Sequence, residues 1–155
     1  MRKTNTLSQD MERFNGSFTQ QEPIPDAGIQ RAVEVLESGR LHRYNVVEGE
    51  KSDTALLETE FADYQGARFC LACASGGYAM QVALSSFGLE YGEPVLTNAF
   101  TLSPVPGAVH NVGGKPVLVE TTEQLVIDLL DLERKIESSG SRVLLLSHMR
   151  GHIAD

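Results

Sequence analysis

The turn Ser75-Gly76-Gly77 has the residue types of an anion-binding loop. It follows an apolar run and precedes a segment with helical periodicity, so it joins a predicted strand to a predicted helix. Two glycines let the backbone approach a ligand closely, and the free N–H groups at a helix start attract a phosphate. A tight turn without any ligand explains the same residues equally well. The pattern is neither a Walker loop nor the G-x-G-x-x-G of dinucleotide-binding folds.

Two large apolar side chains, Phe100 and Leu102, follow the next predicted strand along the chain. In open α/β sheets, ligands bind beyond the carboxyl ends of the strands. Either side chain is therefore placed to cover a flat ring whose anionic group is held at the Ser75–Tyr78 turn. Burial in the core is the alternative, and the residues alone favour it because large apolar side chains are usually buried.

The thiols and imidazoles give weaker signals. Cys70 and Cys73 form a C-x-x-C within a predicted strand, where residues three apart point to opposite faces, so two reduced and buried thiols are expected. His148 and His152 have i, i+4 spacing, but Gly151 lies between them and no H-E-x-x-H motif is present. We therefore predict no metal site.

Alternating helices and apolar strands must position these residues. Helices are predicted from the N-cap Asp26 to Gly39, from about Ser52 to Gly66, from the Ser75 turn to Gly88, and over 128–138; strands are predicted over 69–74, 94–97, 116–119 and 143–147. Pro104 and Pro106 leave 101–112 open, since prolines disfavour a helix interior but fit its first turn. Apolar strands separated by helices predict an α/β fold, with a three-layer, mostly parallel sheet flanked by helices.

Composition narrows the functional class. The chain has 155 residues, 41% of them hydrophobic, which is enough for a core, and a net charge of −8. Its acidic character and scattered basic residues argue against a nucleic-acid partner. The N-terminus has no signal peptide, and the apolar runs are too short to cross a bilayer, so a cytoplasmic protein without a membrane partner is expected.

The two ends of the chain carry separate expectations. Residues 1–22 are polar and aperiodic and are predicted to be a flexible segment, followed by a folded part over 23–155. The last predicted strand is followed by no crossover helix, although Asp155 is a good N-cap residue. The sequence therefore looks truncated.

Five blocks of the sequence resemble the DegT/StrS family of sugar aminotransferases, which are fold-type I enzymes that use pyridoxal 5'-phosphate (PLP). The blocks cover Leu57–Gly66, Ala74–Ala79, Gly88–Val95, Gly114–Glu120 and His148–Asp155, and the family patterns that they resemble include S-G-T-A-A and H-x-x-G-x-x-A-D. Their shared order and spacing extend over roughly two thirds of the chain, which makes the match more specific than any single block.

The resemblance implies a role for each candidate residue. Ser75, Gly76, Gly77 and Tyr78 bind the PLP phosphate through backbone N–H groups, although the family has threonine at Gly77 and alanine at Tyr78. Leu102 aligns with the aromatic residue that usually covers the pyridine ring, and Phe100 is the possible substitute. The family's Schiff-base lysine and its pyridine-binding aspartate lie beyond the chain end, and none of Lys3, Lys51, Lys115 and Lys135 has the expected context.

The resemblance further implies the N-terminal part of the PLP-binding large domain of an enzyme that transfers nitrogen from a glutamate-like donor to a keto-sugar, often nucleotide-linked. The full enzyme is expected to be a homodimer, and this chain alone is expected to be inactive. Two alternatives stay open. One is a PLP-dependent sugar dehydratase of the same family, and the other is a non-catalytic remnant that binds phosphate or dimerises.

Overall fold

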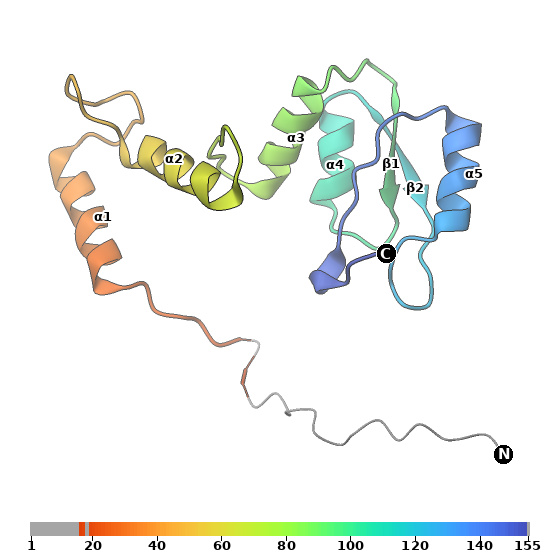
Figure 1. The fold of residues 1–155 in the computed structure, drawn as a ribbon, viewed down its shortest axis with the longest axis horizontal. Coiled ribbons are helices and arrows are strands. Elements are labelled where there is room, and N and C mark those ends of the chain that lie inside the picture. Colours follow the sequence, from red (N-terminus) through yellow and green to blue (C-terminus); the bar gives the residue numbers. More distant parts are fainter. Residues whose placement is uncertain (1–15, 18, 155) are drawn as a thin grey trace. The chain divides into compact units, whose positions relative to one another are not determined.

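The computed structural model describes residues 16–17 and 19–154 (Figure 1). The flexibility predicted for 1–22 falls mainly on residues outside these ranges, and it stays a prediction. By its internal contacts the chain divides into two compact units, of which the first ends at Glu60 and the second begins at Phe61.

The first unit contains helix α1 (Asp26–Ser38) and the beginning of α2 (Asp53–Gln65). The predicted stop of α1 is confirmed, because Gly39 takes a left-handed φ of 67° that suits glycine. The predicted N-cap is wrong by one residue. Pro25 occupies the cap position and Asp26 is the first helical residue, where its charge favours the helix dipole.

Ion pairs connect α1, the following loop and the start of α2. They join Arg31 to Asp53 at 2.8 Å, Arg40 to Glu50 at 3.0 Å and Arg43 to Glu58 at 2.8 Å. Most of these side chains are exposed, so each pair adds little to stability. No residue of α1 is buried.

The second unit is built on two parallel strands, β1 (Pro94–Asn98) and β2 (Lys115–Val119). Pro94 pairs with Lys115 and the register continues to the pair Asn98 and Val119. Both strands were predicted, and β1 extends one residue further than expected.

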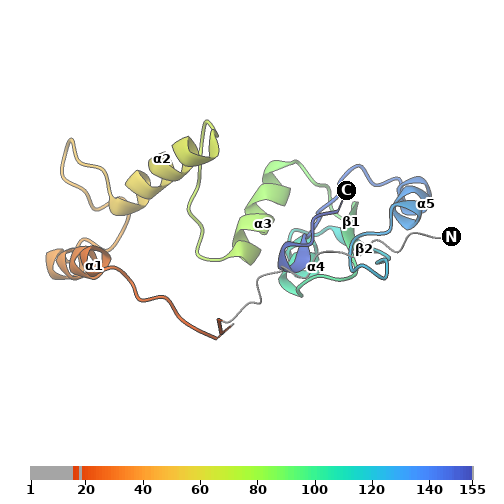
Figure 2. The same cartoon turned by 60° about the horizontal axis from the view of Figure 1, so that its bottom comes forward.

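Helices cover the two faces of this pair of strands, as the two views show (Figures 1 and 2). Helix α4 (Pro104–Asn111) packs on one face, with α3 (Gly76–Ser86) against α4, and α5 (Leu129–Ser139) packs on the other face. The burial pattern along β1 explains this layering, because Val95 packs among buried residues of α3 and α4 whereas Leu96 packs with Val119 and Ile127. The predicted three-layer α/β arrangement is therefore confirmed in this unit.

Two predicted strands are wrong in the described structure. Residues 69–74 form neither helix nor strand, and 143–147 makes only one bridge, between Leu144 and Leu96. At that bridge the Leu96 N–H donates to Val143 O at 2.9 Å and the Leu145 N–H donates to Leu96 O at 2.8 Å. Apolar runs form strands only where a neighbour supplies the ladder hydrogen bonds, and a longer ladder is absent from both segments among the described residues.

The helix ends follow their local signals. Asp128 caps α5, since its carboxylate accepts hydrogen bonds from the N–H groups of Leu130 and Asp131 at 2.9 and 3.2 Å. The segment left open by its prolines is α4, which begins at Pro104, where a missing N–H costs nothing. The apolar residues of α5 are only partly buried, since Leu129 remains 57% exposed.

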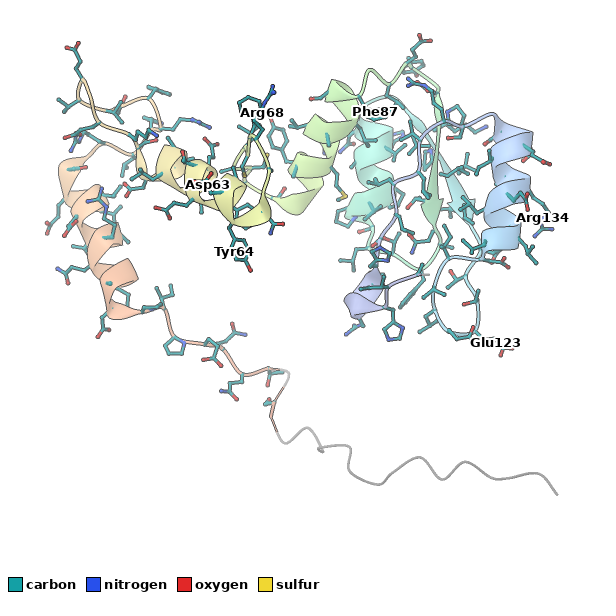
Figure 3. The ribbon with its side chains drawn as sticks, viewed as in Figure 1. Asp63, Tyr64, Arg68, Phe87, Glu123 and Arg134 are labelled. Carbon is teal, nitrogen blue, oxygen red and sulfur yellow. The ribbon has the colours of Figure 1, made fainter. Side chains whose placement is uncertain are left out.

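Asp131 anchors α5 to the end of β2. The residue is 5% exposed, and its carboxylate accepts a hydrogen bond from the Glu120 N–H at 2.7 Å. It also pairs with Lys135 at 2.8 Å and with Arg134 at 3.0 Å. Figure 3 shows Arg134 on the side of α5 that faces away from the strands. The Glu120 N–H and then Lys135 lower the pKa of Asp131 below its ordinary value.

We expect Asp131→Asn to destabilise this unit at neutral pH and to have little effect in strong acid. A lowered folded pKa gives stability that is present above the unfolded value, about 3.9, and that is lost as the pH falls through the folded pKa. Urea unfolding of both proteins from pH 7 to pH 2 measures the difference. Glu133→Gln, which removes an exposed carboxylate of the same helix, is the control. A difference that persists unchanged at the lowest pH would contradict the expectation.

Candidate functional site

The start of α3 presents free backbone donors. Ser75 is the N-cap in an extended conformation (φ −159°, ψ 158°), and its Oγ accepts a hydrogen bond from the Tyr78 N–H at 3.1 Å. The Ser75 carbonyl accepts from the Ala79 N–H at 2.9 Å. Within the described residues, the N–H groups of Gly76 and Gly77 donate no hydrogen bond. These two donors at the positive end of α3 have the chemistry of an anion site.

The Cβ positions of the two glycines have no close contact. A β-carbon placed on Gly76 would have no atom within 4 Å, and one placed on Gly77 would lie 3.5 Å from Cβ of Pro104. Pro104 opens α4, so the starts of α3 and α4 lie next to each other. The serine–glycine turn and the loop after β1 therefore approach at one place, as the sequence predicts.

The loop after β1 carries the two predicted ring-covering residues. Leu102 is 61% exposed, whereas Phe100 is half-buried and its N–H donates to Thr121 Oγ1 at 3.3 Å. Neither side chain belongs to the buried core of this unit. Between them, the buried hydroxyl of Thr101 has no hydrogen-bond partner in the part of the chain that the structure describes. An unpaired buried hydroxyl is costly, so this loop has unused capacity to bind a polar group.

Asn98 is a functional candidate that the sequence reasoning missed. It is the last residue of β1 and is 2% exposed. Its side-chain amide donates to the carbonyls of Phe100 and Ser147 at 2.7 and 3.0 Å, and its Oδ1 accepts from the Ser147 N–H at 2.9 Å. A polar residue at the carboxyl end of an apolar strand was the available signal.

The other residues considered from the sequence do not assemble into a site. Cys70 and Cys73 are free, but they are half-buried rather than buried as predicted. His152 lies with Nδ1 3.3 Å from Gln124 O, and the His148 Nδ1 accepts from the Ala154 N–H at 3.4 Å. Across the described residues no three His, Cys, Asp or Glu side chains gather as metal ligands. No helix in that range is long and apolar enough to cross a membrane.

The arrangement joins an anion-binding site to an apolar surface. The N–H groups of Gly76 and Gly77 would hold a phosphate group, and the loop with Phe100 and Leu102 lies beyond the same ends of the strands. A ligand that carries a phosphate on a flat ring matches both features.

Comparison with known proteins identifies the same family along most of the chain. The sequence model of the DegT/DnrJ/EryC1/StrS aminotransferase family matches residues 24–155. A dTDP-3-amino-3,6-dideoxy-alpha-D-galactopyranose transaminase from Aneurinibacillus thermoaerophilus is 32% identical over 129 residues, which are 82% of this chain and 33% of the relative. A UDP-2-acetamido-2-deoxy-3-oxo-D-glucuronate aminotransferase from Pseudomonas aeruginosa is 34% identical over 95 residues, which are 61% of this chain and 24% of the relative.

Solved structures agree with this fold. The PLP form of Spr1654 from Streptococcus pneumoniae superimposes with a TM-score of 0.74 at 22% identity, over 86% of this chain and 32% of that one. DesV from S. venezuelae gives a TM-score of 0.66 at 30% identity, over 84% of this chain and 32% of that one. The present chain therefore spans about a third of the length of these proteins.

Proposed function

The chain belongs to the DegT/DnrJ/EryC1/StrS aminotransferase family of PLP-dependent enzymes, and on this basis we propose that the start of α3 binds the phosphate of PLP. The observation that carries the proposal is the pair of free N–H groups on Gly76 and Gly77. Family membership by itself does not show that this turn binds phosphate, because one fold supports many functions. The free N–H groups supply the physical reason. The fit is supported by the open space at Gly76 and by the unpaired hydroxyl of Thr101 in the adjoining loop.

The chain's own residues would bind and orient the coenzyme. Gly76 and Gly77 would hold its phosphate, with Ser75 keeping the turn in place through its bond to the Tyr78 N–H. Leu102 or Phe100 would cover the ring by dispersion contacts, since neither is committed to the core. When bound, PLP supplies an electron sink for chemistry at the amino carbon.

For the whole enzyme we propose amino transfer from a glutamate-like donor to a keto-sugar, with a nucleotide-linked sugar favoured. The relatives named above act on dTDP- and UDP-sugars by their descriptions, which supports that substrate class. We further propose a cytoplasmic homodimer. The described lysines Lys51, Lys115 and Lys135 lie outside the turn and loop of the site, so we expect no amino transfer by this chain alone.

The test is to remove one donor without disturbing the helix. We expect Gly76→Pro to weaken the binding of PLP and of inorganic phosphate about tenfold, because one hydrogen bond to a charged group is lost. Proline is well tolerated at the first helical position, and the extended Ser75 is the conformation that a residue before proline prefers. Titrations followed by the amide NMR signals of the Ser75–Ala79 turn give the dissociation constants.

Gly76→Ala is the matched control, because it adds a β-carbon in open space and keeps the N–H. Its affinities should stay within about twofold of the original chain. Equal affinities for all three proteins, or no shift of the Gly77 amide signal on adding phosphate, would rule out the start of α3 as the anion site.

A further inference from the structure

Asn98 joins two segments that are far apart in the sequence through its side chain. Both of its N–H groups donate and its oxygen accepts, with Phe100 and Ser147 as the partners, at 2.7 to 3.0 Å. Ser147 lies 49 residues later in the chain. The side chain therefore fixes the turn after β1 and the segment beside it at the same point.

This position is a costly one to occupy with a polar residue. Asn98 is 2% exposed and is paired with the buried, apolar Val119 of β2. Burying an amide is unfavourable unless it is hydrogen-bonded, and here both N–H groups and the oxygen have a partner. Its bond to Phe100 O holds the start of the loop that leads to Leu102, and that loop ends at Pro104, next to Gly77.

We propose that Asn98 is a positioning residue for the coenzyme ring: it holds the loop that carries Phe100 and Leu102 against the anion site. The inference rests on the proposed function, because it needs a ring above the turn at Ser75–Tyr78. Asn98 itself contacts neither the phosphate nor the ring in this scheme. It acts only through the loop.

This role predicts different effects of an Asn98 substitution on the binding of two ligands. Inorganic phosphate uses the donors of Gly76 and Gly77 alone, whereas PLP uses the donors and the loop. A change at Asn98 should therefore weaken PLP binding and spare phosphate binding. A residue that only stabilises the fold would weaken both or neither.

Asn98→Asp is the sharpest variant, because it keeps the shape of the side chain and removes both donors. Its carboxylate would face the carbonyl oxygens of Phe100 and Ser147, which repel it. We expect PLP binding to weaken about tenfold and phosphate binding to change by less than about twofold. Both constants come from NMR titration of the full chain, with circular dichroism to confirm folding. If this variant does not fold, Asn98→Ser, which keeps an acceptor for the Ser147 N–H, replaces it.

Ser141→Ala is the matched control. Ser141 is also buried and also joins β1 to the later segment, because its hydroxyl donates to Pro94 O at 2.7 Å. This bond lies at the opposite end of β1. Its loss should destabilise the unit and leave the ratio of PLP to phosphate affinity unchanged.

The outcomes separate the two proposals. Equal loss of both ligands in the Asn98 variant, unchanged PLP binding, or a shifted ratio in Ser141→Ala would overturn the role of Asn98. Equal affinity of the original chain for PLP and phosphate would also overturn it, while leaving the anion site intact. Failure of the original chain to bind either ligand would refute the proposed function itself, and the role of Asn98 with it.

Discussion

Gly114→Val is expected to destabilise the second unit by about 3 kcal/mol, because the new side chain has nowhere to go. Gly114 is buried just before β2. A β-carbon there would lie 2.7 Å from Cδ2 of Leu89, 3.0 Å from Cγ1 of Val109 and 3.1 Å from the Val109 carbonyl oxygen. The leucine can rotate away, but the carbonyl belongs to α4 and cannot. A loss of this size is a large fraction of a typical domain's stability, so a substantial unfolded population is expected.

Thermal unfolding followed by circular dichroism measures this effect, with Gly107→Ala as the control. Gly107 lies within α4, and a β-carbon there would meet no atom within 4 Å. Alanine should stabilise that helix by about 0.5–1 kcal/mol. Opposite signs for two glycine replacements so close in sequence would trace the effect to local space. Similar stability changes in both variants would contradict the packing described around Gly114.

Leu96→Ala is expected to cost about 2–5 kcal/mol, the usual range for a fully buried leucine. Leu96 is 1% exposed and packs with Val119 and Ile127. Its backbone also makes the two hydrogen bonds that hold the segment containing Leu144. The cavity would therefore lie where β1, β2 and that segment meet.

Leu118→Ala on β2 provides the comparison, because Leu118 is 49% exposed. Leu118→Ala should lower the free energy of unfolding by well under half as much as Leu96→Ala. Less apolar area is buried at Leu118, and no closed cavity forms there. Urea denaturation of both variants gives the two free energies of unfolding. A larger loss for Leu118 would mean that the outer face of β2 is covered in solution.

The sequence predicted those elements whose signals are local. The Gly39 stop and the helix predicted over 128–138 depend on neighbouring residues, and both are present. The predicted strands β1 and β2 are present because each supplies the other with a partner. The predicted strands over 69–74 and 143–147 depend on a partner strand. Apolar composition reports that a segment suits a sheet, but it does not report whether a neighbour supplies the ladder hydrogen bonds.

The candidate site likewise contains parts that local sequence predicts and parts that it does not. The turn at Ser75–Tyr78 was predicted because serine, glycines and helical periodicity are adjacent in the sequence. Asn98 was missed because its partner Ser147 is 49 residues away, and no local pattern records that hydrogen bond. The exposure of Leu102 was likewise unavailable, since large apolar residues are ordinarily assigned to the core.

The single bridge at Leu144 has a consequence for how this segment finds its alignment. An extended ladder would tolerate sliding by two residues, because each new pairing resembles the last. Hydrogen bonds fix this segment at both ends of β1. Ser141 bonds to Pro94 O at the first end, and Asn98 bonds to Ser147 at the other. A shift of the segment in either direction breaks the hydrogen bonds at both ends. These two polar side chains therefore set the register of the segment against β1. Replacing them should change that register and leave the apolar core of the sheet unchanged.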